Sequence, residues 1–408
     1  MFQFNEFCTP SENDEFVSNH PLCNLLQSSS WAKIKSNWNH IYTSMSEDNK
    51  IVATAMILVK PLPFGFTLFY IPRGPIMDYN NLPLMKAYFK ELVNLGKKHR
   101  CLYIKFDPSI LKNQYTINEP NEQTRLECEK TLRDLKSNGA LHLGFSKDIK
   151  SVIQPRYQAN VYASNDFQDN LPRHTKRLMN DAIKRGVQIE MKGIDSTDEF
   201  ANVVSKTESR KKISLRNHEY FNRLMETYGD DAKIVLGVIN LKEQIGAKKK
   251  QLDEAEHEIK LIEEHQVKKL KRVDDQIKSI QKDLNELSTI TLSDNEESDR
   301  VVIAGCLSIK FGDTMEMLYA GMDDRFKKMM PQYLIYVNQM QWAFDHGCRY
   351  CNMGGVEGTL DDGLTKFKSN FNPLIDEYIG EFDLPVNKLL YKSSQWAYKI
   401  KKNMKIAR

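Results

Sequence analysis

The chain has 408 residues, of which 41% are hydrophobic and 10% aromatic, so it has room for two or three domains with proper cores. Its formal net charge of +4 is too small to indicate nucleic-acid binding through overall charge, and its seven scattered cysteines are typical of reduced thiols. The N-terminal MFQFNEF predicts no secretory signal, and no apolar run approaches the ~20 residues of a membrane helix.

The first third of the chain alternates strand and helix patterns. KIVATAMILVKPL (50–62) and GFTLFYIPRGPIMDY (65–79) predict strands because they are rich in β-branched and aromatic residues. LPLMKAYFKELVNLGKKHR (82–100) predicts an amphipathic helix, and CLYIKFDP (101–108) predicts a further strand. Just before this region, Trp31 and Trp38 are seven residues apart, a spacing that predicts packing on one helix face.

Similar patterns return in the second part. RHTKRLMNDAIKRG (173–186) predicts a basic helix that ends at its glycine. AKIVLGVI (232–239) predicts a strand, and RVVIAGCLSIKFGDTMEMLYAGM (300–322) predicts a hairpin that turns at FGD. Strand, helix and strand segments therefore recur in two α/β units of similar plan.

A long charged segment without glycine or proline, 248–287, lies between these two strand patterns. Its apolar residues step by three and four, as in a heptad seam: Leu252, Ala255, Ile259, Ile262, then Leu270, Val273, Ile277, Ile280, Leu284 and Leu287. The register slips around EEHQV, which predicts two antiparallel helices of ~20–25 residues and an arm roughly 30–37 Å long. Because a hairpin returns the chain to its starting point, we interpret the arm as an insertion into a domain.

Several kinds of chemistry have no motif in the chain. The glycine loops GxGxxG and GxxxxGK are absent, which excludes the usual ATP and NAD sites, so no cofactor is expected. No serine lies in a GxSxG elbow. The pair Cys348 and Cys351 lacks a second pair of ligands, so no metal site is expected.

Short, dense motifs stand at the predicted strand ends and turns: WAKIKSNW, YIPRGPIMDY, KFDPSI, RKKISLRNHEYF, LYAGMDD, NMGGVEG, FKSNFNP and EYIGEF. Through these motifs and their order, the chain resembles the FemABX family of non-ribosomal peptidyl transferases over essentially its whole length, most closely the MurM-type branch. The resemblance implies an α/β (α+β) fold of two tandem GNAT-like acetyltransferase domains with a coiled-coil arm. We expect the first domain at 1–148, completed by 380–408, the second at 149–379, and the arm at 241–291.

The activity that the resemblance implies is aminoacyl transfer from aminoacyl-tRNA to the lysine amine of a peptidoglycan stem peptide. The acceptor is a lipid-linked muramyl pentapeptide precursor, the transferred amino acid is Ala or Ser ahead of Gly, and the enzyme is cytoplasmic and peripheral to the inner face of the cell membrane. Two alternatives stay open: the partner enzyme that adds the second bridge residue, and a non-enzymatic scaffold that binds tRNA or coiled coils.

The resemblance also implies substrate-binding residues. Lys35 and Arg216 match the family's phosphate contacts, and Tyr220 and Tyr319 match further contacts with the precursor. Arginine suits a diphosphate by its forked geometry and lysine as a point charge. Without the resemblance, Lys35 would be interpreted as a solvated lysine and Tyr319 as a core tyrosine.

Four further residues match the family's catalytic positions. Phe367 and Lys368 match the place where a lysine faces the reacting carbonyl, and Asp107 and Glu381 match carboxylates near the acceptor. Neither carboxylate is assigned as the base, because substrate-assisted proton transfer competes. From the residues alone, Lys368 would be interpreted as a solvated lysine, and Asp107 is equally well a turn residue.

Two basic segments are candidates for charged partners. We expect tRNA to be bound mainly by charge, in part through Arg173, Lys176, Arg177, Lys184 and Arg185 of the helix 173–186, with the arm as a further candidate. A solvated helix face explains each of these residues as well. The tail 398–408, with five Lys or Arg and no acidic residue, is expected to meet anionic lipid.

Overall fold

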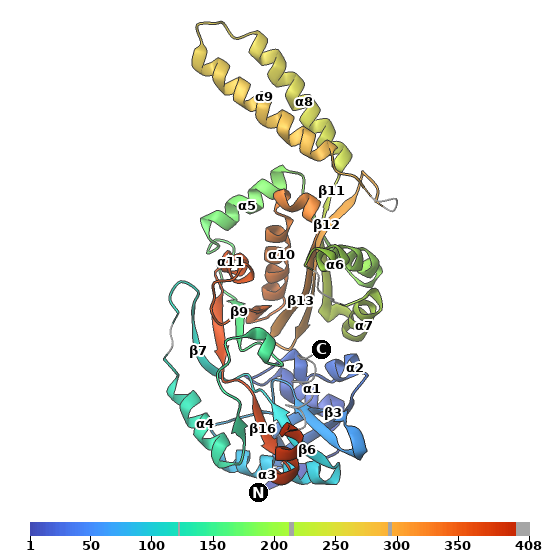
Figure 1. The fold of residues 1–408 in the computed structure, drawn as a ribbon, viewed down its shortest axis with the longest axis vertical. Coiled ribbons are helices and arrows are strands. Elements are labelled where there is room, and N and C mark those ends of the chain that lie inside the picture. The colour runs from blue at the N-terminus through green and yellow to red at the C-terminus, as the bar shows by residue number, and fades with distance from the viewer. Residues whose placement is uncertain (121–122, 212–215, 293–295, 397–408) are drawn as a thin grey trace.

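The computed structural model describes residues 1–408 except 121–122, 212–215, 293–295 and 397–408. Figure 1 shows an elongated molecule in which two α/β bodies are stacked and a pair of helices projects from the second body. The predicted fold class is confirmed: two α/β units carry an antiparallel helical arm. Within the described residues, no helix is both long and apolar enough to cross a membrane.

The first body is built on an eight-stranded sheet in the order β1-β2-β3-β4-β6-β16-β8, with β5 paired to β3. Its strands are β1 Phe2–Asn5, β2 Asn39–Glu47, β3 Lys50–Pro61, β4 Thr67–Ile71, β5 Ile76–Met77, β6 Cys101–Phe106, β8 Leu141–His142 and β16 Phe382–Pro385. Its helices are α1 Pro10–Ser18, α2 Ser29–Ile34, α3 Leu82–Lys98 and α4 Leu126–Ser137. All pairings are antiparallel except that of β4 with β6.

Helix α3 illustrates how the sequence forms this layer. The side chain of Asn81 accepts a hydrogen bond from the backbone N–H of Leu84 and caps the first turn. Leu84, Tyr88 and Leu92 then recur every four residues and are buried in the core of the first body. The helix is therefore held both by its cap and by one apolar face.

The second body has a sheet in the order β10-β11-β12-β13-β14-β9-β15-β7. Its strands are β7 Leu111–Thr116, β9 Tyr157–Tyr162, β10 Gln188–Lys192, β11 Ala232–Ile239, β12 Val301–Phe311, β13 Thr314–Met322, β14 Tyr350–Gly355 and β15 Leu374–Tyr378. Its helices are α5 Arg173–Lys184, α6 Thr197–Lys211, α7 His218–Tyr228, α10 Pro331–Asp345 and α11 Gly363–Ser369.

The two bodies exchange strands. Strand β16, from the C-terminal segment, pairs with β6 and β8 in the first sheet. Strand β7 precedes the expected boundary at 148 but pairs with β15 in the second sheet. Each exchanged strand satisfies backbone N–H and C=O groups that would otherwise form an open edge, so the bodies are joined through their sheets as well as by the chain.

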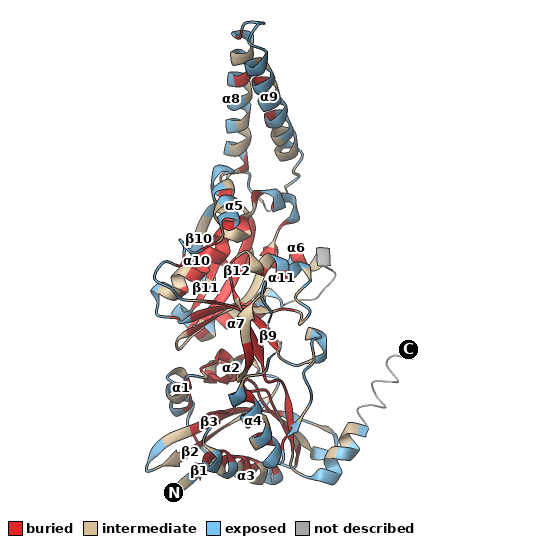
Figure 2. Cartoon of the chain, turned by 90° about the vertical axis from the view of Figure 1, so that its left-hand side faces the viewer, coloured by how far each residue is buried: buried red, intermediate tan, exposed pale blue. Residues whose placement is uncertain are grey.

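The arm consists of α8 (Leu241–Lys260) and α9 (Val267–Ser288). Its own core contains Ala255, Ile262, Val273, Ile277 and Ile280, while the rest of its surface is mostly exposed (Figure 2). The predicted antiparallel hairpin is thus confirmed. Between 241 and 288 the sequence carries 11 Lys or Arg and 11 Asp or Glu, so the arm has no net charge.

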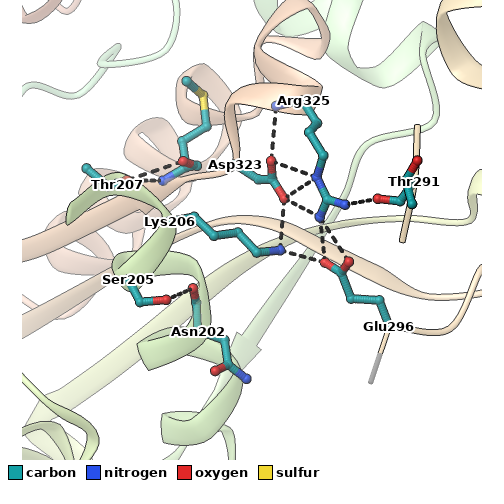
Figure 3. Close-up of polar contacts among 9 residues, drawn as sticks. Asn202, Ser205, Lys206, Thr207, Thr291, Glu296, Asp323 and Arg325 are labelled. Carbon is teal, nitrogen blue, oxygen red and sulfur yellow. Dashed lines mark hydrogen bonds and ion pairs between the residues drawn. The ribbon is translucent and has the colours of Figure 1, made fainter. Parts of the chain in front are cut away.

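The root of the arm is fixed to the second body by apolar and ionic contacts. Ile245 and Leu287 pack against the core of that body. The exit segment of the arm is held by Arg325, whose guanidinium bonds to the Thr291 carbonyl and lies 2.7 Å from Glu296 (Figure 3). Lys206 of α6 lies 2.5 Å from the same carboxylate. Helix α6 is therefore tied to the arm.

Candidate functional site

The candidate site begins where two parallel strands end together. In the first sheet Ile71 of β4 is in register with Phe106 of β6, so the residues that follow these strands reach the same edge. Arg73 and Asp107 lie there. On the other side of β6, Phe382 pairs with Phe106, which sets Glu381 opposite Asp107. Three strands thus bring a cation and two carboxylates to one edge.

Asp107 is buried, with 2% of its surface exposed. Its carboxylate accepts a hydrogen bond from the backbone N–H of Arg73 at 3.0 Å, and the Tyr70 hydroxyl lies 3.4 Å from its other oxygen. Burial raises the pKa of Asp107 to about 7, while the Arg73 guanidinium acts in the opposite direction and the neighbouring Glu381 adds to the increase. A carboxyl with this pKa is suited to accept a proton near neutral pH.

Glu381 is also buried and is held on both oxygens. One oxygen accepts the backbone N–H of Ile153, and the other lies 3.4 Å from the Lys105 ammonium. Lys105 also pairs with Asp383 at 2.8 Å. These contacts orient Glu381 in an ion-pair network beside Asp107.

A cleft of about 480 Å³ lies between the two bodies on the far side of Tyr70. It is lined by Trp31, Ile34, Lys35, Ser36, Asn37, Trp38, Leu58, Tyr70, Pro72, Ile153, Gln154, Arg216, Tyr220 and Arg223. Three of these described residues are cations and none is a carboxylate. Such a lining is suited to an anionic ligand such as a diphosphate.

The cations of the cleft lie against aromatic rings. The Lys35 ammonium lies 4.8 Å from the ring of Trp31, and the Arg216 guanidinium lies 5.0 Å from that of Tyr220. Burial, together with the charge of Arg216, lowers the pKa of Lys35. The Tyr319 hydroxyl lies 3.4 Å from that of Tyr220, so Tyr319 supports the wall from behind.

The expectation that Trp31 and Trp38 share a helix face is wrong. Helix α2 ends at Ile34 and is capped by Lys35, so Trp38 lies beyond it. Its ring instead lines the cleft and packs edge-on against Tyr70 at 6.5 Å. The helix ends just before Lys35, and Lys35 and Trp38 both line the cleft.

Lys368 does not line this cleft. It lies on α11 with 3% of its surface exposed, and its ammonium donates a hydrogen bond to the Gly355 carbonyl at 2.8 Å. The alternative of a solvated lysine is therefore wrong. Gly355 packs so closely on Pro155 that a Cβ there would lie 2.5 Å from the proline ring. Pro155 follows Gln154, a cleft residue, so a thin wall separates Lys368 from the cleft.

Phe367 has a different environment from its neighbour Lys368. Its ring packs at 5.2 Å from Tyr336 and 5.4 Å from Phe371, in an aromatic cluster beneath α11. It is not among the residues that line the cleft. The structure therefore assigns Phe367 to anchoring α11, and through it Lys368.

Two strands of the second sheet separate beside Lys368 and form a fork. Strands β13 and β14 are parallel and pair only as far as Glu316 with Asn352, after which they separate. Glu316 is half-buried, and desolvation raises the pKa of its carboxyl to about 7 against the opposing effects of the Asn352 amide and the Arg73 guanidinium. The fork thus holds a second carboxyl of high proton affinity. Glu316 looks like a solvated strand residue in the sequence, so no pattern identifies it.

The basic helix α5 lies beside α11. Thr175 bonds to the Asn370 carbonyl just after α11, and the buried face of α5 packs on the second body. Arg173, Arg177, Lys184 and Arg185 are exposed, and Arg185 bonds to the Lys328 carbonyl. Lys176 is half-buried and donates to the Asp169 carbonyl at 2.7 Å. The membrane-binding tail expected at 398–408 lies outside the described residues.

The structure groups most of the expected residues around one cleft. Lys35, Arg216 and Tyr220 form its cationic and aromatic wall, with Tyr319 behind Tyr220, and Asp107 and Glu381 lie behind Tyr70. Phe367 and Lys368 lie across the wall, and the α5 cations lie beyond α11. Sequence reasoning missed Arg73, Gln154 and Arg223. Arg223 follows Tyr220 by three residues on a helix, a spacing that could have identified it. Among the described residues, no three His, Cys, Asp or Glu side chains are grouped as a metal site requires.

Comparison with known proteins shows the family of the chain. The FemAB family profile matches residues 8–399. The chain belongs to the FemAB family. It is 26% identical to the lipid II:glycine glycyltransferase of Staphylococcus aureus (strain USA300), over 94% of this chain and 93% of that protein. It is also 26% identical to the aminoacyltransferase FemA of Staphylococcus epidermidis (strain RP62A), over 89% and 91% of the two chains.

Among solved structures, the crystal structure of FemX matches with a TM-score of 0.74 and 25% identity, over 96% of this chain and 99% of that one. The expected family and the expected class of enzyme are therefore confirmed: this FemAB protein is an acyltransferase. The alternative of a non-enzymatic scaffold is set aside.

Proposed function

We propose that this FemAB protein transfers an amino acid from aminoacyl-tRNA to the lysine side-chain amine of a lipid-linked muramyl pentapeptide, and so builds the interpeptide bridge of peptidoglycan. The observation that carries the proposal is the cleft with three cations and no carboxylate, which is connected through Tyr70 to the buried pair Asp107 and Glu381. The name of the S. aureus relative, lipid II:glycine glycyltransferase, supports a lipid-linked acceptor.

The acceptor diphosphate binds in the cleft. Lys35 and Arg216 contact its oxygens, and Arg223 adds a third cation on the same wall. The ring of Tyr220 holds both arginines in place, and the Tyr319 hydroxyl contacts that of Tyr220. The stem peptide then extends past Tyr70 toward the two carboxylates.

The nucleophile is the stem-peptide amine, which must lose a proton before it attacks. A lysine amine with its usual pKa of ~10.4 is mostly protonated at pH 7, and deprotonation costs about 4–5 kcal/mol. Asp107, with a pKa near 7, accepts this proton. Glu381, paired with Lys105, lies beside Asp107 on the side of the site where the acceptor binds. The free amine forms a bond to the ester carbonyl carbon, the bond from that carbon to the ribose oxygen of the tRNA breaks, and the proton that the bound nitrogen now loses passes to the ribose oxygen.

The tRNA approaches from the side of the second body. The exposed cations Arg173, Arg177 and Lys184 on α5 contact its phosphates, and α5 is bonded to the end of α11, which carries Lys368. Lys368 stabilises the oxygen that becomes negative when the amine attacks. The arm contributes little to tRNA binding by charge, because its charges sum to zero.

The purified protein tests the proposal with Ala-, Ser- and Gly-tRNA, each combined with the lipid-linked precursor. We expect an acceptor heavier by one amino acid residue with at least one of the three, and its mass identifies the donor. Using the precursor with and without a first bridge residue separates this enzyme from the partner that adds the second. Failure to form product in every combination would contradict the proposal.

A matched pair of lysines on α2 tests the cleft. Lys35→Met should raise the KM for the precursor at least tenfold, because it removes a phosphate contact. Lys33→Met should leave it unchanged, because Lys33 is exposed on the same helix and does not line the cleft. Equal KM values in the two variants would remove the cleft from the proposed acceptor site.

A further inference from the structure

One segment of the first body exposes an unusual number of apolar side chains. The segment runs from β8 to the start of the cleft wall, residues 141–153. Leu141 is 44% exposed, Leu143 48%, Phe145 42% and Ile153 50%. Single exposed apolar residues need no explanation, but four within thirteen positions form a patch of the kind that marks an interaction surface.

Local disorder does not explain this exposure, because backbone hydrogen bonds hold the segment along its length. The N–H of Leu143 donates to the Glu381 carbonyl at 2.9 Å, and the N–H of Ile153 donates to the Glu381 carboxylate. Between these points, the N–H of Ile149 donates to the Glu357 carboxylate at 3.0 Å, and the Ser146 carbonyl accepts from Arg156 at 2.9 Å. Both ends of the loop meet at Glu381, so its apolar side chains are presented from a fixed backbone.

The patch is continuous with the proposed diphosphate cleft. Ile153 belongs to both, since it lines the cleft and is half exposed. The segment also carries exposed Lys147 and Lys150, and its one acidic side chain, Asp148, accepts from the backbone N–H of Lys150. An apolar surface with two exposed lysines therefore begins where the cationic cleft ends.

We infer that this segment binds the hydrocarbon chain of a lipid diphosphate acceptor at the point where the chain leaves the diphosphate. The inference rests on the proposed function, because it requires the diphosphate to occupy the cleft. In such a lipid the hydrocarbon is esterified directly to the terminal phosphate, so the first part of the chain must lie against whatever surface adjoins the phosphate site. Ile153 lines the cleft, and Leu143 and Phe145 precede it on the same fixed segment with exposed side chains, so the gain comes from removing apolar area from water.

The test compares two acceptors that share the muramyl pentapeptide diphosphate. One carries a nucleoside and the other a short, water-soluble isoprenyl chain, and both are used without detergent or vesicles. The variant is the double substitution Leu143→Gln, Phe145→Gln, which leaves the backbone contacts and Ile153 in place. The control is Phe64→Gln; Phe64 is 90% exposed beside Thr67, at the opposite end of β4 from the site.

We expect the double variant to lower the ratio of kcat/KM for the isoprenyl acceptor to that for the nucleoside acceptor at least tenfold, while Phe64→Gln leaves the ratio unchanged. An unchanged ratio in the double variant overturns the inference, and so does a wild-type enzyme that uses only the nucleoside acceptor. Equal losses on both acceptors also overturn it, because they indicate a structural role; thermal unfolding of the variant then reports how far the fold is affected.

Two further outcomes separate this inference from the proposed function and from binding of the segment to a bilayer. If the wild type acts on neither acceptor, the proposed function fails and the inference fails with it. If the ratio is unchanged but the double variant no longer floats with acceptor-free vesicles of anionic phospholipid, the patch contacts a bilayer and not the acceptor chain.

Discussion

Lys368→Met removes one charge from the candidate site and keeps the length of the side chain. Lys368 is 3% exposed and sits at the fork of the second sheet, with its ammonium 2.8 Å from the Gly355 carbonyl. In the proposed reaction the ester oxygen gains nearly a full negative charge. At ~4 Å and an effective dielectric constant of ~20, a cation stabilises such a charge by about 4 kcal/mol. Loss of one donor to an oxyanion typically costs 10²–10³ in rate, about 3–4 kcal/mol.

The same substitution also affects stability. It removes a hydrogen bond from a charged donor, which contributes about 1.5–3 kcal/mol to the free energy of unfolding, and it removes the cost of burying the ammonium. These effects oppose each other, so we expect the variant to fold and to melt within a few degrees of the wild type. Phe367 remains in its aromatic cluster and keeps α11 in place.

Single-turnover kinetics with the charged tRNA and the precursor measure the catalytic effect. We expect the rate to fall at least a hundredfold while the Kd values of both substrates change little, because the contact matters mainly in the transition state. Lys366→Met is the matched control, since Lys366 is exposed on the same helix. A rate within about threefold of the wild type, less than ~0.7 kcal/mol, would refute the assigned role of Lys368.

Three further predictions concern pH, the arm and the tRNA. Burial raises the pKa of Asp107 from its unfolded value to about 7, so the contribution of Asp107 to the free energy of unfolding is present at low pH and is lost as pH rises through 7. Asp107→Asn should abolish that part of the pH dependence of unfolding. It should also abolish the acidic limb of kcat/KM near pH 7. Identical pH profiles for variant and wild type would contradict this. Replacing 249–282 by a short glycine-serine loop should leave a soluble, cooperatively melting protein, because the arm's core is its own, and aggregation of that protein would show otherwise. Reversing the charges of Arg173, Arg177 and Lys184 should weaken tRNA binding and reduce its salt dependence, and an unchanged Kd across a salt titration would exclude α5 as the contact.

The local patterns of the chain predicted its secondary structure well. The β-branched run in 50–62 and the helical spacing in 82–100 correspond to β3 and α3, and the heptads correspond to α8 and α9. These patterns are local because side chains on one face of a helix or strand recur at a fixed interval. The pairing of β7 with the second sheet could not be predicted in this way, because strand pairing depends on which edges lie together after folding.

The same distinction between local pattern and tertiary contact applies to the candidate site. Motifs in sequence order identified Lys35, Arg216 and Asp107 through the family resemblance, since each motif is a short run of neighbouring residues. Only the tertiary structure brought Arg223 into the same cleft and connected Asp107 to it through Tyr70. No run of sequence contains these contacts.

The fold alone decided the proton affinity of Asp107 and the solvent exposure of Lys368. The sequence specifies a carboxylate at 107 and an amine at 368, but their ordinary properties would make both solvated charges. Burial between β4, β6 and β16 raises the pKa of Asp107, and packing of α11 against the Gly355 carbonyl removes Lys368 from water. Proton affinity depends on desolvation and neighbouring charges, and for these two residues both are supplied by segments far apart in the chain.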